Sequence, residues 1–430
     1  MPLIPKYLPR RLSSVRARLG VFTDRVSADV ALAAGALFIL SVALTACDNA
    51  RAARTESAPA SLSSAKVTVV SGFRWAKTVE WSQGGPELAL TISEPWKGAR
   101  APLRYILRRT GASEAGSPEQ GASTSKSAPS KKTAGTIPTL LLPARRIVCL
   151  AAVHVGFLSA LGATDRIVAV DEKSHVHDAF VRSGIEVGRI AEVGSGAQLN
   201  VERLLTVKPD LVLANAISES ENQALDRLRR AGIPVLVTSE WMENHPLARA
   251  EWIRLIGVLI GHDARADSLF GAVESAYLRL ADRARRLPDR PTVLLGGPFR
   301  DQWFVSGGQS FMARLLGDAG GHYLWEDDST AGGVPLSFEA VLVRARDADV
   351  WLHPSDWRSV GEIGKRDARF ARFGAFRRGD VYNNDARLLP DGANDYWETG
   401  VTRPDRVLAD LVSIFHGGED SLYYYRRLPP

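Results

Sequence analysis

Six of the eight histidines lie in predicted loops or close to them, where an imidazole nitrogen could bind a metal ion. Neutral imidazole is a good ligand for zinc and for haem iron. A loop histidine is nevertheless usually just solvated, and the sequence has no long His/Asp-rich loop that would gather zinc. We therefore predict no bound metal ion and no cofactor. The six residues are His154, His175, His177, His245, His322 and His353.

Tryptophans and arginines in predicted loops offer a second kind of chemistry, the binding of a large aromatic or anionic ligand. Aromatic side chains bury a large area with few rotatable bonds, which suits the walls of a binding cleft. Two further tryptophans, Trp252 and Trp351, lie inside predicted elements and are expected in the core. The candidates in or beside loops are Trp241, Trp303, Trp325, Trp357 and Trp397, together with Arg300, Arg358 and Arg387.

Motifs for covalent or phosphate chemistry are absent from the sequence. There is no nucleophile elbow, no HExxH and no complete phosphate loop. The segment from Gly194 to Leu199 lacks the third glycine of a dinucleotide fingerprint, and the segment from Gly361 to Lys365 lacks phosphate-loop spacing. The sequence therefore gives no support to an enzyme, although an enzyme on an α/β scaffold is an open alternative.

The N-terminus has the pattern of an export signal. Six basic residues precede an apolar run from Val30 to Ala46, and small residues end that run. Leu44-Thr45-Ala46-Cys47 resembles the lipobox of bacterial lipoproteins, so Cys47 is expected to carry a lipid. The alternative is an uncleaved anchor, because 17 apolar residues are borderline for spanning a membrane.

Charge and cysteine content narrow the possible partners. The chain has 54 Lys and Arg against 48 Asp and Glu, and removal of the signal lowers its net charge from +6 to near +2. Such a small excess gives no support to nucleic-acid binding. Cys149 lies in an apolar run without a second cysteine to pair with once Cys47 is lipidated, so we expect a buried thiol.

Composition divides the chain into eight segments. Short, continuous β-branched runs alternate with helical patterns from residue 145 onward, which predicts parallel strands covered on both faces. Apolar residues from Trp252 to Leu280 repeat at helical spacing with a break at Gly261-His262. The segments are a signal peptide (1–46), a tether (47–65), a small β module (66–110), a low-complexity linker (111–144), an N-terminal α/β lobe (145–245), an interlobe helix (246–287), a C-terminal α/β lobe (288–416) and a tail (417–430).

An internal repeat supports two equivalent lobes. Leu199–Leu205 and Leu336–Leu342 each combine a cap residue, a first-turn glutamate and an apolar helix. A hydrophobic strand follows each of them after a few residues. The predicted fold class is therefore α/β, with two Rossmann-like lobes that contain parallel sheets, one long helix between them and a small N-terminal β module.

In this order and spacing, the motifs resemble the substrate-binding proteins of iron-siderophore, haem and cobalamin ABC importers. The resemblance covers roughly residues 145–416. The β-rich segment 66–109, Asn394–Glu398 and the Tyr423–Tyr425 tail are similar to a lipoprotein subgroup. The motifs are Arg146-Ile147-Val148, Leu158–Val170 (LSALGATDRIVAV), Asn200–Val212 (NVERLLTVKPDLV), Leu228–Val235 (LRRAGIPV), Gly317–Gly321 (GDAGG) and Leu336-Ser337-x-Glu339.

This resemblance implies a function. A lipid-anchored protein on the periplasmic face of a bacterial membrane would capture an iron(III)-siderophore, haem or cobalamin between its lobes and deliver it to an ABC permease dimer. Glu202 and Glu339 would pair with permease arginines, although a first-turn carboxylate also simply complements the helix dipole. A permease-independent surface lipoprotein, acting as scavenger or sensor, is the alternative. The expected ligand-binding residues are His154, Trp241, Arg300, Trp303, Trp357 and Trp397.

Overall fold

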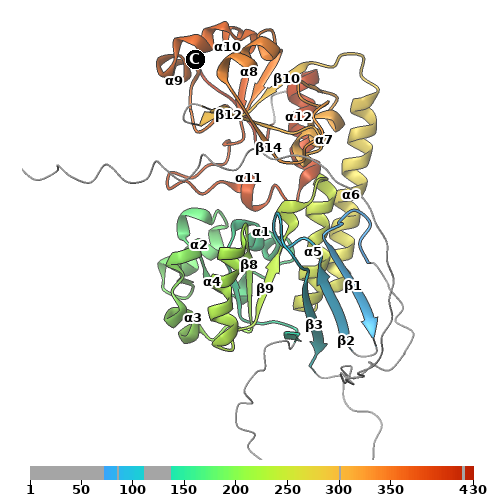
Figure 1. The fold of residues 1–430 in the computed structure, drawn as a ribbon, viewed down its shortest axis with the longest axis vertical. Coiled ribbons are helices and arrows are strands. Elements are labelled where there is room, and N and C mark those ends of the chain that lie inside the picture. Colours follow the sequence, from blue (N-terminus) through green and yellow to red (C-terminus); the bar gives the residue numbers. More distant parts are fainter. Residues whose placement is uncertain (1–71, 85–86, 111–136, 300–301, 419–421) are drawn as a thin grey trace, which may run out of the picture. The chain divides into compact units, whose positions relative to one another are not determined.

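The computed structural model describes residues 72–84, 87–110, 137–299, 302–418 and 422–430. Two α/β lobes, an N-terminal β-sheet and a pair of helices make up this part of the chain (Figure 1). The predicted signal peptide, Cys47, the predicted tether, the first six residues of the predicted β module (66–71) and Arg300 lie outside the described residues. None of the described helices has the length and apolarity needed to cross a membrane.

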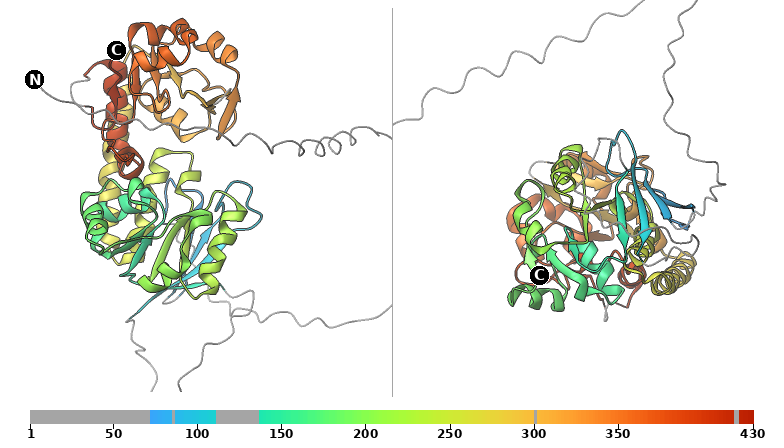
Figure 2. Two further views of the ribbon diagram at one scale, coloured as in Figure 1. Left: turned by 90° about the vertical axis from the view of Figure 1, so that its left-hand side faces the viewer. Right: turned by 90° about the horizontal axis from the view of Figure 1, so that it is seen from below.

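The β-module is a four-stranded sheet in the order β1-β2-β3-β4. Its first three strands form the expected antiparallel meander, and the fourth, which comes from the segment predicted to be linker, pairs parallel to β3. The module shares one hydrophobic core with the N-lobe, beside which it lies in Figures 1 and 2. The strands are β1 (Val79–Gly84), β2 (Glu87–Ile92), β3 (Leu103–Arg109) and β4 (Thr139–Leu142).

The N-lobe contains a wholly parallel sheet in the order β7-β6-β5-β8-β9. Alternate residues of its strands belong to separate cores on its two faces, as the continuous apolar runs predicted. Cys149 is a buried free thiol, as expected. The elements are β5 (Ile147–Cys149), α1 (Ala152–Ala160), β6 (Ile167–Val170), α2 (Ala179–Glu186), β7 (Ala191–Glu192), α3 (Val201–Val207), β8 (Leu211–Asn215), α4 (Glu219–Arg230) and β9 (Val235–Thr238).

Two antiparallel helices, α5 (Pro246–Ile260) and α6 (Asp263–Arg285), replace the single interlobe helix that the sequence predicted. Gly261 ends α5 with a left-handed φ of 72°, a conformation that only glycine adopts without strain, and the chain reverses there. Arg254 on α5 pairs with Asp267 on α6, 2.7 Å apart. Phe270 of α6 belongs to the N-lobe core and Ala281 to the C-lobe core, so α6 joins the two.

The C-lobe has a five-stranded sheet in the order β13-β10-β15-β16-β17 and a small antiparallel sheet β11-β12-β14. Its last strand comes from the predicted tail, whose Tyr424 and Tyr425 are buried. The strands are β10 (Thr292–Leu295), β11 (Pro298–Phe299), β12 (Gln302–Ser306), β13 (His322–Tyr323), β14 (Gly333–Leu336), β15 (Val350–Leu352), β16 (Val381–Asn383) and β17 (Arg426–Arg427). The helices are α7 (Phe311–Asp318), α8 (Phe338–Ala345), α9 (Val360–Arg366), α10 (Gly374–Arg378), α11 (Asp395–Glu398) and α12 (Pro404–His416).

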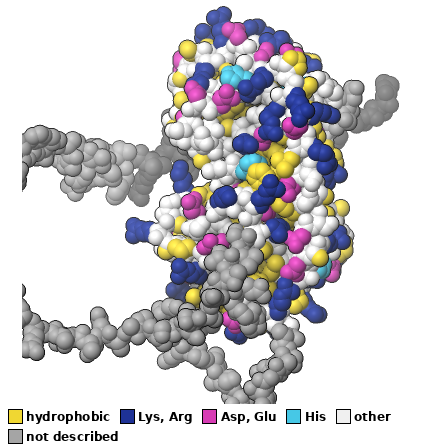
Figure 3. All heavy atoms as spheres, turned by 90° about the vertical axis from the view of Figure 1, so that its right-hand side faces the viewer, with side chains coloured by type: hydrophobic (Ala, Val, Ile, Leu, Met, Phe, Trp, Pro, Cys, Tyr) yellow, Lys and Arg dark blue, Asp and Glu magenta, His cyan; other side chains and the backbone are white. Residues whose placement is uncertain are grey.

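The surface carries no stripe of one charge on the face drawn in Figure 3, where Lys and Arg side chains are interspersed with Asp and Glu. Electrostatic recognition of nucleic acid requires basic side chains gathered on one face or along one helix. The absence of nucleic-acid binding stays a prediction from the net charge.

Candidate functional site

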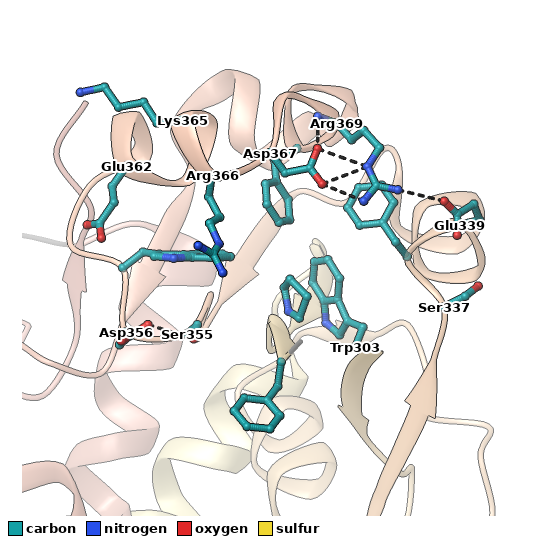
Figure 4. A pocket seen from close by; sticks show the side chains of 15 residues that line it. Trp303, Ser337, Glu339, Ser355, Asp356, Glu362, Lys365, Arg366, Asp367 and Arg369 are labelled. Atoms are coloured by element: carbon teal, nitrogen blue, oxygen red, sulfur yellow. Dashed lines mark hydrogen bonds and ion pairs between the residues drawn. The ribbon is translucent and has the colours of Figure 1, made fainter. Parts of the chain in front are cut away.

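A large cavity of about 1240 Å³ lies in the C-lobe. It lies beyond the carboxyl ends of β10 and β15, the edge at which open parallel sheets bind their ligands. We call it the C-lobe pocket (Figure 4). Its lining residues are Pro298, Phe299, Trp303, Ser337, Phe338, Glu339, Ser355, Asp356, Trp357, Glu362, Lys365, Arg366, Asp367, Arg369 and Phe370.

Aromatic rings form the base of the C-lobe pocket. Trp303 is fully buried and lies 5.6 Å from the ring of Trp351, and its Nε1 donates a hydrogen bond to the carbonyl of Leu295. Trp357 packs edge-on against Phe370 with 5.3 Å between ring centroids. These rings hold one another and the sheet in place, so the base of the pocket is rigid. Trp303 was expected to contact the ligand, but it has no exposed surface and supports the base from below; Trp357 is 9% exposed.

The loop after β15 forms one wall of the pocket and carries unusual backbone conformations. His353 has a φ of 54° and Ser355 a φ of 99°, both in the region that favours glycine. Asn383 helps to hold this loop, because its Nδ2 donates a hydrogen bond to the backbone carbonyl oxygen of Ser355 (2.8 Å). Strained residues of this kind persist where surrounding structure fixes them, and they cluster at binding sites.

Charged side chains surround the aromatic base. Arg369 bonds Asp367 (2.8 Å) and Glu339 (3.1 Å), so its charge is already matched. Lys365 and Arg366 make no ion pair with any described residue. In Figure 4, Arg366 extends toward the cavity and Lys365 points away from it. Arg366 is therefore a cation that a bound anion can reach without displacing another partner.

The structure brings together three of the residues that the sequence singled out, Trp303, Trp357 and Glu339. The sequence analysis missed Phe299 and Arg366. Phe299 follows β10 closely, so its position after a strand could have revealed it. Arg366 lies in a helix far along the chain, and only the folded C-lobe places it at the pocket.

His154 lies in α1, although a loop position was expected. The first strand ends earlier than its apolar run, and the helix begins at once. The imidazole is fully buried, its Nε2 lies 2.9 Å from Thr238 Oγ1, and its Nδ1 has no partner. Burial lowers its pKa to about 3. With no exposed atom, His154 contributes to the interior of the N-lobe.

Acid is expected to destabilise the protein through His154. The folded chain keeps this imidazole neutral down to about pH 3, whereas the unfolded chain binds a proton below about pH 6.5. Stability is therefore complete above pH 6.5 and falls toward pH 3 by up to about 1.4 kcal/mol per pH unit. Urea unfolding at pH 7.0, 5.5 and 4.5 should show that the free energy of unfolding falls less steeply with decreasing pH in the His154→Gln variant than in the wild type. Equal slopes for the two proteins would contradict this assignment.

The remaining predicted ligand-binding residues are separated from the C-lobe pocket. Trp241 lies in a short 3-10 helix after β9, and its Nε1 is buried without a partner. Trp397, on α11, is 55% exposed and borders a separate cavity of only about 60 Å³. Trp252, Trp325 and Trp351 are buried, which confirms the core positions expected for the first and last of them.

Helix α11 connects the C-terminal part of the chain to the N-lobe. Glu398 Oε2 accepts a hydrogen bond from the backbone N–H of His177 (2.6 Å), and Arg182 pairs with Asp391 at 2.6 Å. The carbonyl of Glu398 approaches Gly156 so closely that a Cβ there would lie 2.0 Å from it. Burial raises the pKa of Glu398 to about 8.

His177, Asp395 and Glu398 form the one group of side chains in the described structure whose ligand atoms could jointly hold a metal ion. These groups already have partners. Asp395 accepts from Arg387 Nε and Thr399 Oγ1, each at 2.6 Å. The cluster therefore serves the contact between α11 and the N-lobe.

His175 lies outside this cluster and is half exposed. It is bonded to the buried carboxylate of Asp171 (2.6 Å), which raises the pKa of His175.

Glu202 and Glu339 occupy equivalent positions in the two lobes. Each is exposed in the first turn of a helix, α3 or α8, whose N-cap side chain accepts a backbone N–H. Asn200 caps the first helix and Ser337 the second, as the repeat predicted. The two carboxylates differ in their surroundings, because Glu339 pairs with Arg369 whereas Glu202 has no ion pair among the described residues.

Two α/β lobes joined by a helical hairpin, with a large pocket at the carboxyl ends of parallel strands, define a two-lobed ligand-binding protein. The chain belongs to the periplasmic binding protein family, whose model matches residues 147–388, more than half of its length. The predicted fold class is confirmed. The family consists of binding proteins, which also confirms the expectation that the chain is no enzyme.

Curated relatives point to the same family. An uncharacterized lipoprotein of Methanocaldococcus jannaschii is 22% identical over 284 residues, which cover 64% of this chain and 66% of the relative. An uncharacterized ABC transporter substrate-binding lipoprotein of Bacillus subtilis is 26% identical over 57% of this chain and 74% of its own length. A vitamin B12-binding protein of Yersinia pestis is 26% identical over 48% of this chain and 70% of its own length.

Solved structures with a similar fold include a periplasmic haem-binding protein from Pseudomonas aeruginosa. It has a TM-score of 0.49 and 22% identity, with 64% of this chain and 93% of that chain covered. An ABC-type Fe³⁺-hydroxamate transport protein from Saccharomonospora viridis gives a TM-score of 0.48 and 20% identity, covering 64% and 94%.

Proposed function

We propose that this protein is the lipid-anchored substrate-binding component of an ABC importer. It captures an iron(III)-siderophore, haem or cobalamin and delivers it to a membrane permease, with Cys47 as the lipidated residue. The observation that carries this proposal is the C-lobe pocket, which combines a rigid aromatic base with an unpaired arginine. Lipoproteins among the relatives support the anchoring, and a vitamin B12-binding relative supports a cargo of this class.

The size and lining of the pocket favour a large cargo. Pockets for small molecules usually occupy about 300–1000 Å³, and the C-lobe pocket reaches about 1240 Å³. Aromatic rings such as Trp357 suit a flat or aromatic-rich surface, and Arg366 suits carboxylate or catecholate oxygens. Of these cargoes, haem, with its two propionates, and ferric catecholate siderophores carry negative charge.

Tryptophan fluorescence identifies the cargo directly. The mature chain from residue 48 should be titrated with ferric siderophores, hemin and cyanocobalamin, and one class should quench saturably at micromolar or tighter affinity. If that cargo is anionic, Arg366→Gln should weaken it about tenfold, since a hydrogen bond to a charged group contributes about 1.5–3 kcal/mol. Lys365→Gln, the same charge change on a side chain that points away, is the matched control. Absence of quenching by every class would contradict the proposal.

Docking to the permease is assigned to Glu202 and Glu339. Their exposure, their equivalent first-turn positions and their presence in both lobes support pairing with arginines on two permease subunits. We expect the double variant Glu202→Ala/Glu339→Ala to abolish uptake while leaving cargo affinity unchanged. Uptake should be measured with the radiolabelled cargo in cells. Unchanged uptake would overturn the docking assignment and favour a permease-independent scavenger or sensor.

A further inference from the structure

Arg369 stands between the pocket and one of the two docking carboxylates. Its Nη1 lies 3.1 Å from Glu339 Oε1, while Nε and Nη2 lie 2.9 and 2.8 Å from Asp367 Oδ2. The guanidinium also stacks over the ring of Phe338 at 4.2 Å. Figure 4 shows the three charged side chains in a row along the edge of the pocket.

The two contacts of Arg369 have different strengths. Asp367 is a close neighbour on the same chain segment, and it binds the guanidinium through two nitrogens, so this contact fixes the position of the arginine. Glu339 is reached through a single nitrogen, and its side chain is 70% exposed. Loss of the Glu339 contact would leave Arg369 in place, still held by Asp367 and by the ring of Phe338.

The N-lobe has no equivalent of this arrangement. Glu202 forms no ion pair within the described ranges, so a permease arginine would meet a carboxylate that is free of competing charge. At Glu339 an arginine of the other permease subunit would have to compete with Arg369. Since Arg369 also lines the C-lobe pocket, an anion inside the pocket and the carboxylate of Glu339 compete for one guanidinium.

We propose that Arg369 masks the docking carboxylate Glu339 in the cargo-free protein and that an anionic cargo releases it. This inference rests on the proposed docking function. An anion that accepts the hydrogen bond from Arg369 Nη1 leaves Glu339 free to pair with a permease arginine. The loaded protein therefore docks more tightly than the empty one. By linkage, permease binding must then raise the affinity for the anionic cargo by the same factor.

The expected effect is modest because the pair is exposed to solvent. Exposed ion pairs of this kind change affinity by about 1.4- to fivefold. It should shrink as salt is added, since screening acts strongly on exposed charges. A change of this size is enough to bias a permease toward loaded proteins when the two forms compete for it.

Affinity for the cognate permease in nanodiscs tests the masking. At low salt, Arg369→Gln should bind the permease up to about fivefold more tightly than the wild type. Arg372→Gln makes the same charge change on the same short 3-10 helix (Ala368–Arg372) and should not have this effect. The gain should vanish in the Glu339→Gln background. If Glu339→Gln weakens docking but Arg369→Gln leaves it unchanged, the masking is overturned and the docking assignment survives. If neither Glu202→Gln nor Glu339→Gln weakens docking, the docking assignment itself fails.

The same assay tests release by cargo. Hemin and a ferric catecholate siderophore serve as anionic probes, and cyanocobalamin serves as the probe without carboxylates. At least one anionic probe should raise the affinity of the wild type for the permease by the same factor as the Arg369→Gln substitution does. The same probe should not raise the permease affinity of the Arg369→Gln variant any further. Unchanged docking with both anionic probes, or equal tightening of the Arg369→Gln variant, would overturn the release by cargo.

Discussion

Replacing Glu251 with alanine should lower the free energy of unfolding by about 3–5 kcal/mol, because it removes one partner of a buried charge-assisted network. Glu251 lies on α5 and is fully buried. Its carboxylate accepts the backbone N–H groups of Arg74, Trp75 and Ala76 at 2.7, 2.7 and 2.9 Å. Alanine would leave these three donors unpaired where the β-module joins the helical hairpin.

Urea unfolding at pH 7 measures this effect. Asp282→Ala removes an equivalent charge from an exposed pair on α6 and should change stability by less than about 1 kcal/mol. Hydrogen exchange should also show loss of protection at residues 74–76 in the Glu251 variant alone. A loss of stability below about 1 kcal/mol for Glu251→Ala would mean that the module is held mainly by its apolar contacts.

The second large effect is expected at Gly156, where α11 contacts α1. A Cβ at this position would lie 2.0 Å from the backbone oxygen of Glu398, which cannot move aside as a flexible side chain could. Gly156→Ala should therefore displace α11 and cost about 1–3 kcal/mol or more, the usual range for overpacking. The loss outweighs the gain of up to about 1 kcal/mol that alanine normally brings inside a helix.

Gly271→Ala provides the matched control, because Gly271 also lies inside a helix and a Cβ there would meet nothing within 4 Å. This control should stabilise the protein by about 0.5–1 kcal/mol. Thermal or urea unfolding compares the two variants, and hydrogen exchange at His177, whose N–H bonds Glu398, reports on the α11 contact. Equal stabilisation by both alanines would show that α11 does not pack on α1 in solution.

Prediction from the sequence worked best where a local pattern is sufficient. The helix capped by Asn200 and its equivalent capped by Ser337 begin where the repeat predicted them. Periodicity and capping are properties of neighbouring residues, so a single sequence contains them. The same local patterns predicted the burial of Cys149 and Trp252.

Expectations that depended on contacts across the chain were less accurate. The helix predicted for 246–287 keeps its apolar periodicity, but Gly261 reverses the chain and turns it into a hairpin. His154 was expected at a ligand site, and it lies in the N-lobe interior because α1 starts immediately after β5. Residues of the predicted linker and tail add strands β4 and β17 to sheets formed elsewhere in the chain.

The sequence by itself determined the two α/β lobes, the binding-protein class and the paired glutamates, since each follows from periodicity, motif order or a repeat. Only the tertiary structure decided which side chains surround the C-lobe pocket. Arg366 and Arg369 come from a helical segment after β15, whereas Phe299 follows β10 more than sixty residues earlier. Their proximity depends on the parallel pairing of β10 with β15, and such long-range pairing leaves no local signal in the chain.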